Sequence, residues 1–259
     1  MPIRRAPPSQ HTRNKMRLGR LPHDPVALAA APAHQFGSDS PPPVLDRSGV
    51  DFAPGEYGNR IFPDCSAAGL ANYARAVTAL NGYQLVVAPD KPLAFYGECV
   101  GNPPDLESTH GAVLLDVLDK QASLGFDIGP QRLVGLYGTV PRQRAALALS
   151  IARFGAGYWG ITLRAQDMVT FGGDGPWDTT GDDGDTVGGH CVVAFDYTGL
   201  GDTDTVRVAT WGAWKPATWR WVEARLDEAH ALVYRQLVKA DGTFYAGLTP
   251  DGLATALNT

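Results

Sequence analysis

The sequence predicts an α+β fold in which a helical N-terminal part is followed by an antiparallel sheet. Alanine-rich apolar segments of helical length fill the first half of the chain. Runs of β-branched and aromatic residues bounded by glycine fill the second half. A length of 259 residues with 44% hydrophobic residues is enough to bury one sizeable core. We therefore expect one main domain, formed by residues 50–259.

The first fifty residues differ in composition from the rest of the chain. Residues 1–20 carry six Lys and Arg side chains and no acid, and residues 21–50 are rich in Pro, Ala and Ser. Such a segment cannot bury enough apolar surface to fold alone. We expect ordered structure to begin around Val50, after an extended basic arm over residues 1–49. This arm is either a disordered tail or a segment held by neighbouring protein subunits.

The first clear element is a helix over residues 66–80. Pro63 ends any upstream helix, Asp64 suits the N-cap position, and Asn81-Gly82 ends the helix. Cys65 therefore falls in the first helical turn. Unpaired amides and the helix dipole are expected to stabilise a thiolate there and to lower the pKa of the cysteine. Alternatively, Cys65 is a small buried residue that helps the helix to pack.

Further helices and strands are expected downstream of this helix. The helices are predicted over residues 109–123 with Ser108 as the cap, over 141–154 and over 219–232. The strands are predicted over residues 157–163, 187–196, 204–211 and 233–238. The second of these strands is entered through glycines and carries a histidine near its start.

Cys65 and His190 form a candidate nucleophile and base. A thiol becomes a strong nucleophile when a histidine accepts its proton, and the imidazolium then protonates the leaving amine. A helix start and a strand start can face each other across a cleft. Gly188 and Gly189 would leave space for a substrate beside the imidazole. Alternatively, His190 is a satisfied structural residue at the start of a strand.

Three short motifs follow one another in a recognisable order: Asp64-Cys65-Ser66-Ala67-Ala68 opening a helix, Gly188-Gly189-His190 opening a strand, and Trp211-Gly212 closing the next strand. Together they resemble the papain family of cysteine peptidases over roughly residues 50–240. More narrowly, the chain resembles uncharacterised papain-like proteins of bacteriophages and actinobacteria, through Leu18-Gly-Arg-Leu-Pro22, the Pro-rich arm and Asn59-Arg. The resemblance implies a two-lobed papain-like fold, with a helical N-terminal lobe and an antiparallel β C-terminal lobe.

The resemblance also implies residue roles. Cys65 would be the nucleophile and His190 the general base and acid. Asn59 lies six residues before Cys65, where the family places a glutamine whose amide joins the backbone amide of the cysteine in the oxyanion hole. Alternatively, Gly58-Asn59 is a turn-forming pair.

The third position of the expected triad departs from the family pattern. The family's Asn-Ser-Trp-Gly is Ala209-Thr210-Trp211-Gly212 here, and alanine cannot orient an imidazole. Thr210 would take over through its hydroxyl if the strand register shifts, because adjacent strand residues point to opposite faces. A Cys–His dyad can act without a third group, so both weakened activity and loss of activity stay open. The family's Cys-Gly-Ser-Cys-Trp signature is absent, and its structural disulfide with it.

Residues 172–185 form an acidic, glycine-rich segment ahead of His190. The spacing of Asp182, Asp183 and Asp185 matches no EF-hand calcium loop, so a solvated loop that overhangs the cleft is expected. We expect no cofactor and no bound metal. The tryptophans of the C-terminal half are assigned to packing: Trp211, Trp214, Trp219 and Trp221.

Charge and composition exclude several classes of function. A net charge of −5 gives no broad positive field, so the folded domain is not expected to bind nucleic acid. No apolar run approaches the roughly 18 residues of a membrane span, and the N-terminus lacks the apolar core of a secretory signal. We expect cytoplasmic synthesis without a signal peptide. Cys65, Cys99 and Cys191 form no CxxC motif, and at least one thiol stays unpaired.

Two functions from different classes follow. The first is a papain-like cysteine hydrolase, a peptidase or amidase acting on a peptide or protein; Cys65, His190 and Asn59 favour it. The second is a catalytically weak or inactive papain-like component of a phage virion or other assembly, anchored by residues 1–49. Ala209 and the acidic segment favour this second function.

Overall fold

The computed structural model describes residues 16–34, 39–101, 110–179, 181–245 and 247–258. These residues combine helices with an antiparallel sheet, as predicted. The sheet has six strands in the order β3-β8-β4-β5-β6-β7. Its strands are β3 (Gly135–Thr139), β4 (Gly157–Arg164), β5 (Thr186–Tyr197), β6 (Thr205–Thr210), β7 (Ala213–Thr218) and β8 (Leu226–Tyr234).

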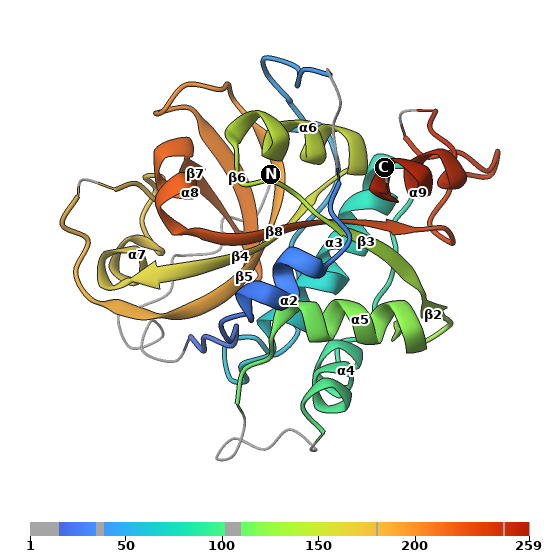
Figure 1. The fold of residues 1–259 in the computed structure, drawn as a ribbon, viewed down its shortest axis with the longest axis horizontal. Coiled ribbons are helices and arrows are strands. Elements are labelled where there is room, and N and C mark those ends of the chain that lie inside the picture. Colours follow the sequence, from blue (N-terminus) through green and yellow to red (C-terminus); the bar gives the residue numbers. More distant parts are fainter. Residues whose placement is uncertain (1–15, 35–38, 102–109, 180, 246, 259) are drawn as a thin grey trace, which may run out of the picture.

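The helical part is built around α3 (Cys65–Leu80). This helix is buried over most of its length because it is packed between β5 on one side and two further helices on the other. Those helices are α4 (Lys91–Val100) and α5 (Leu114–Leu124), which lie together on the side of α3 away from α7 and α8 (Figure 1). The predicted helix over residues 66–80 is confirmed, and it starts at Cys65 itself.

The remaining elements lie around these two parts. Two-residue strands β1 (Phe126–Asp127) and β2 (Arg132–Leu133) form a separate small hairpin. The remaining helices are α2 (Pro25–Ala30), α6 (Arg144–Phe154), α7 (Ala165–Thr170), α8 (Trp219–Arg225) and α9 (Pro250–Asn258). In the described ranges, no helix is both long enough and apolar enough to cross a membrane.

The helix predicted over residues 219–232 is wrong beyond Arg225. Helix α8 ends there, and the chain continues directly as strand β8 from Leu226. Strand β8 pairs with β3 on one side and β4 on the other, so it is an inner strand that is buried almost throughout. Leucine and alanine in this stretch favour a helix locally, and the pairing with two neighbours outweighs that weak preference.

Two predicted helix starts also differ from the structure. Helix α5 begins at Leu114, with Val113 at its N-cap; the proposed cap Ser108 and start Thr109 lie outside the described residues. Helix α6 begins at Arg144 rather than at Pro141, because Gln143 at the N-cap is still extended. The strands predicted over residues 157–163, 187–196 and 204–211 are confirmed within one or two residues.

The expectation that ordered structure begins around Val50 is wrong. Arg47 is buried, and its guanidinium donates to the carbonyl oxygens of Gly155 and Phe195 at 2.6 Å each and of Ile151 at 3.1 Å. Backbone bridges join the preceding segment to the body at three places: Arg20 with Ala112 and Gly189, Ala33 with Thr139, and Leu45 with Tyr197. Residues 16–34 and 39–49 therefore belong to the fold. Contact of the arm with neighbouring subunits stays a prediction.

Candidate active site

The Cys65 thiol lies where helix α3 meets strand β5. The cysteine is the first residue of the helix, so its backbone N–H has no partner within the helix. The backbone amides of Cys191 and Gly19 approach the thiol. Because Cys191 directly follows His190, this contact places the helix start against the strand position that carries the predicted base.

Burial sets the protonation state of Cys65. Only 1% of the residue is exposed, and burial raises the pKa of its thiol to about 12; the nearby Asp64 acts in the same direction. The amides of Cys191 and Gly19 lower this pKa, but they do not offset the loss of hydration. The prediction of a lowered cysteine pKa at the helix start is therefore wrong for the closed site seen here.

His190 is fully buried on β5, opposite Ile161 of β4. Its Nε2 lies 2.7 Å from Oγ1 of Thr210. The ring stacks on Trp211, with 4.1 Å between the ring centres and 17° between the planes. The other ring nitrogen, Nδ1, is buried and finds no hydrogen-bond partner in the described part of the chain. Trp211, assigned to packing from the sequence, thus covers one face of the candidate base.

The pairing of β5 with β6 explains how Thr210 reaches the imidazole. Ala209 pairs with Val193, so the next residue, Thr210, lies on the face of β5 that carries Val192 and His190. The register shift on which this contact was predicted to depend is present, because the ladder is irregular between Ala194 and Asp196; without it Thr210 would pair with Val193 and lie on the other face. Ala209 is on the opposite face, which is why an alanine is tolerated there.

Burial also controls the charge on His190. It lowers the pKa of the imidazole to about 3, and the positive charge of Arg20 acts in the same direction. At neutral pH the closed site therefore holds a neutral thiol and a neutral imidazole. A thiolate–imidazolium pair requires a change that hydrates the site.

Asn59 lies in the turn that precedes α3. Its backbone N–H donates to the carbonyl of Glu56 at 3.0 Å, and its side-chain amide donates to Oδ1 of Asp64 at 3.2 Å. A turn is present at this point, since Tyr57 and Gly58 both have positive φ, at 55° and 91°. Because the amide bonds to Asp64, a role for Asn59 in an oxyanion hole stays a prediction.

Asp64 does not cap α3 as the sequence suggested. It occupies the N-cap position, but its side chain makes no capping hydrogen bond and accepts instead from Asn59. The carboxyl is buried, and that burial raises its pKa to about 8. Its second oxygen, Oδ2, has no hydrogen-bond partner among the residues that the structure describes.

Replacing Asp64 by asparagine is expected to flatten the pH dependence of stability. Folding raises the pKa of this carboxyl from 3.8 to about 8, so its stabilising effect is complete below pH 3.8 and is lost as the pH rises through 8. Asparagine at this position does not titrate. Urea unfolding at pH 5 and pH 8 should show a smaller difference for Asp64→Asn than for the unmodified chain. The control Asp90→Asn, at another helix start but exposed, should keep the original difference; equal slopes for all three chains would contradict the assignment.

Residues of the N-terminal arm lie directly over the site. The backbone N–H of Gly19 faces the Cys65 thiol, and the carbonyl of Gly19 accepts from the N–H of Ala112 at 2.7 Å. Arg20 donates its backbone N–H to the carbonyl of Gly189 at 3.1 Å. The arm thus joins the helical part to the sheet, across Cys65 and beside His190.

Glycines make this close approach possible. A Cβ atom on Gly19 would lie 1.9 Å from the carbonyl oxygen of Pro63, and one on Gly189 would lie 2.3 Å from the carbonyl oxygen of Arg20. A Cβ on Gly111 would lie 2.2 Å from the carbonyl oxygen of Gly19. The space predicted beside the imidazole is therefore present, and the arm fills it.

Comparison with solved structures shows what this arrangement resembles. Xylellain, a cysteine protease from Xylella fastidiosa, superposes with a TM-score of 0.63 at 13% identity, over 90% of this chain and 98% of the other. A procathepsin B from Trypanosoma congolense gives 0.58 at 13% identity, over 85% and 87% of the two chains. The digestive procathepsin L 3 of Tenebrio molitor gives 0.55 at 12% identity, over 86% and 78%.

The chain has a papain-like fold. No protein-family model and no curated protein sequence matches it. At such low identity the likeness is one of fold, and the chemistry of this papain-like chain has to be argued from its own residues.

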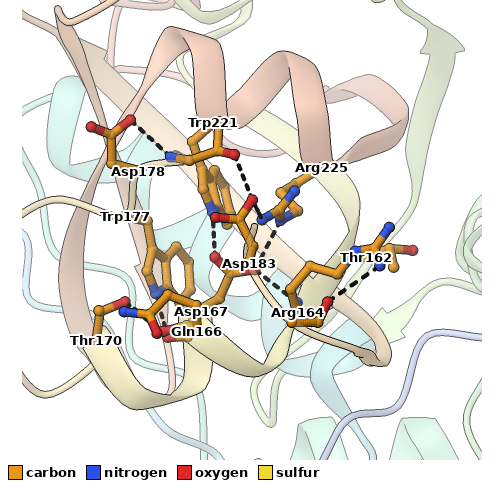
Figure 2. Close-up of polar contacts among 12 residues, drawn as sticks. Thr162, Arg164, Gln166, Asp167, Thr170, Trp177, Asp178, Asp183, Trp221 and Arg225 are labelled. Carbon is orange, nitrogen blue, oxygen red and sulfur yellow. Dashed lines mark hydrogen bonds and ion pairs between the residues drawn. The ribbon is translucent and has the colours of Figure 1, made fainter. Parts of the chain in front are cut away.

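Most of the acidic segment of this papain-like fold is exposed, Asp182 and Asp185 included, as predicted, but Trp177 and Asp183 anchor it to the body. Asp183 is mostly buried and pairs with Arg225 at 2.5 Å, and Arg225 also binds Asp167 at 2.9 Å (Figure 2). Trp177 donates to the carbonyl of Asp167 and stacks on Trp221, which binds the carboxylate of Asp167. Within the described ranges, no group of three or more His, Cys, Asp or Glu side chains is arranged to hold a metal ion.

Sequence reasoning missed the arm residues and their acidic partners. Gly19 and Arg20 stand in the motif Leu18-Gly-Arg-Leu-Pro22, which supports the resemblance but indicates no role in the site. Asp227 and Glu228 were placed inside a predicted helix, so their position in a strand facing the arm was hidden. A lone Gly-Arg pair within a basic, Pro-rich segment carries no local signal for such a contact.

Proposed function

We propose that the chain is a cysteine hydrolase that cleaves a peptide or amide bond, with Cys65 as nucleophile and His190 as base. One observation carries this proposal: the buried imidazole of His190 is held through Nε2 by Thr210, while Nδ1 has no partner in the described chain. The amide of the next residue meets the Cys65 thiol at a helix start. The papain-like fold supports the same assignment.

The proposed chemistry uses both ring nitrogens of His190. If Nε2–H donates to Thr210, Nδ1 carries a lone pair and accepts the thiol proton as the sulfur adds to the carbonyl carbon. Collapse of this adduct breaks the C–N bond, and the imidazolium gives its proton to the leaving amine. Water, deprotonated by the same imidazole, then cleaves the thioester to release the acid and restore the thiol. The free N–H of Cys65 at the helix start can stabilise the oxyanion.

Asn59 is proposed as the second oxyanion donor. Its amide is buried in the turn before Cys65, on the side of the helix start, and is now engaged by Asp64. If the Asn59 amide donated to a substrate oxygen in place of Asp64, it would complete the oxyanion hole. Protonation of Asp64, favoured by its raised pKa, weakens the bond that Asn59 would have to give up.

The arm would keep this hydrolase latent. The backbone N–H of Gly19 approaches the thiol, whereas a substrate must place a carbonyl carbon next to the sulfur. The arm therefore blocks the site and is not itself positioned for cleavage. The same segment buries Cys65, and the charge of Arg20 disfavours the imidazolium. Activity is therefore expected only after the arm leaves the cleft.

Hydrolysis of a random-sequence peptide library tests the proposal. The arm is displaced by Gly19→Leu, because a side chain at residue 19 collides with the backbone of Pro63. New peptide termini should appear with this chain and should vanish when Cys65→Ala is added. Absence of cleavage by a folded Gly19→Leu chain whose Cys65 is accessible would overturn the proposal.

Replacing Thr210 by valine is expected to lower kcat of the arm-displaced chain by about 10- to 100-fold, because the imidazolium loses a hydrogen bond worth about 1.5–3 kcal/mol. The pH at which activity rises should also shift, as the charged form of His190 becomes less stable. Thr210→Ser should restore both quantities. Thr205→Val, on the same strand but with its hydroxyl near Thr198, should change neither. An unchanged pH profile of activity in the Thr210→Val chain would contradict a positioning role for Thr210.

A second function is favoured by the closed state itself. With Cys65 at a pKa of about 12 and His190 at about 3, the site is chemically quiet while the arm is seated. An inactive papain-like component of a virion or other assembly would require no further chemistry from this site. The two functions differ in the arm-displaced chain, which cleaves peptides only if the first is right.

A further inference from the structure

A buried lysine lies on the same face of the sheet as the candidate base. Lys215 of β7 pairs with Val208 of β6, two residues before Thr210. Side chains two residues apart on a strand share a face, so Lys215, Thr210 and His190 follow one another across β7, β6 and β5. Only 2% of Lys215 is exposed. Burial lowers the pKa of its ammonium to about 8, so the group is charged at neutral pH and needs partners in place of water.

Three backbone carbonyls surround this ammonium. Nζ of Lys215 donates to the carbonyl oxygens of Thr170 at 2.7 Å, Gly173 at 3.2 Å and Gly175 at 2.7 Å. An ammonium has three N–H donors, so the loop over residues 170–177 engages all of them. The middle of this loop is exposed to solvent, and its backbone is folded around a buried charge. The ammonium therefore fixes the path of the loop.

The loop carries two aromatic rings that contact Trp211. Phe171 meets Trp211 edge-on, with 4.9 Å between the ring centres and 79° between the planes, and Trp177 lies 6.4 Å away at 83°. Trp211 in turn stacks on His190. Its φ is 45°, and a bulky residue keeps such a conformation only when its surroundings hold it there. The loop around the lysine therefore supports the indole that lies against the candidate base.

We propose that Lys215 is a positioning residue for His190, acting through Phe171 and Trp211. The inference rests on the proposed function, because it concerns the base of that site. The face of an indole attracts a cation, so a stacked Trp211 stabilises the imidazolium that forms during the reaction. Without the ammonium, three carbonyls lose their donor and the loop no longer holds Phe171 against the indole. The charged form of His190 then loses part of its support.

An NMR titration of the His190 imidazole tests this role without requiring catalysis. The full chain carries Gly19→Leu, to displace the arm, and Cys65→Ala, to prevent turnover. Adding Lys215→Met keeps the aliphatic stem and removes the charge, and the pKa of His190 should fall by about half a unit. Loss of a positive charge acting directly on the ring would raise this pKa, so the sign of the shift separates the two effects. The charge of Arg20, which lowers the same pKa in the closed site, is withdrawn equally from both chains.

Further variants complete the titration. Lys239 also donates to a backbone carbonyl, at 3.5 Å, and Lys239→Met should leave the pKa of His190 unchanged. Phe171→Leu removes the edge contact with Trp211 and should lower this pKa by a similar amount, after which Lys215→Met should add little. Lys215→Gln keeps two N–H donors for the loop and should give an intermediate shift. It replaces Lys215→Met if that chain does not fold.

The hydrolysis assay then separates the two proposals. In the arm-displaced chain with Cys65 intact, Lys215→Met should lower kcat about threefold, which corresponds to half a pKa unit. A pKa of His190 that stays constant or rises with Lys215→Met, or that falls equally with Lys239→Met, overturns the inference even if peptides are cleaved. A lowered pKa with no cleavage of any peptide overturns the proposed function alone, because the imidazole is then positioned but performs no hydrolysis.

Discussion

Replacing Gly19 by leucine is expected to raise the rate at which iodoacetamide modifies Cys65 by about 100-fold, because the clash with the Pro63 backbone costs about 3 kcal/mol of arm binding. In the unmodified chain the thiol is 1% exposed, and burial holds its pKa near 12, so it should react very slowly at neutral pH. Displacement of the arm exposes the sulfur and returns its pKa towards the ordinary range. Mass-spectrometric mapping of the alkylated peptides distinguishes Cys65 from the partly exposed Cys99.

Gly49→Leu provides the matched control for this experiment. It places the same side chain in the same N-terminal segment, at a position where a Cβ atom has no neighbour within 4 Å among the described residues. Its alkylation rate should equal that of the unmodified chain. If Gly19→Leu and Gly49→Leu behave alike while both stay folded, the arm does not protect Cys65.

Acid is expected to release the arm. In the closed state burial lowers the pKa of His190 from 6.5 to about 3, so the imidazole takes up a proton readily only when the site opens. Arm seating is therefore complete above pH 6.5 and is weakened as the pH falls towards 3. For a single group this linkage increases the open population about 30-fold at pH 5 relative to neutral pH. Limited proteolysis of residues 16–22, with the protease rate calibrated at each pH, measures that population.

Two variants check the acid response. His190→Ala should remove the increase at pH 5, since no imidazole remains to bind the proton. Glu228, whose pKa is held below its ordinary value by His230 and Arg20 despite burial, acts in the same direction at lower pH, so some release should persist towards pH 4. Replacement of the exposed His110 by alanine should preserve the full response. A response that survives His190→Ala undiminished at pH 5 would assign it to another group.

The elements that carry the candidate site were predictable because their signals are local. Pro63, the alanine-rich run and Asn81-Gly82 predict a helix with Cys65 in its first turn, with no reference to the rest of the chain. The apolar run after Gly189 likewise defines the strand of His190. The order of these two elements, together with Trp211-Gly212, was enough to suggest the papain-like fold that the structural comparison shows.

What could not be predicted depends on contacts between distant segments. The pKa of Cys65 is raised by burial among segments that are distant in the sequence, whereas the helix start alone gives the opposite sign. The contact of Thr210 with His190 depends on the pairing of Ala209 with Val193. The strand from Leu226 to Tyr234 has a composition that suits a helix, and only its two neighbouring strands make it extended.

The position of the arm in the sequence has a consequence for the newborn chain. A ribosome releases residues 16–22 before Cys65, and the proposed pair of Cys65 and His190 is incomplete until His190 has emerged. Glu228, which holds Arg20, follows within a few tens of residues of the base. The arm is therefore synthesised before the residues that it covers. It is available to the folding chain when the thiol and the imidazole first come together. Other chains being translated from the same mRNA would then be protected from cleavage by the order of synthesis alone.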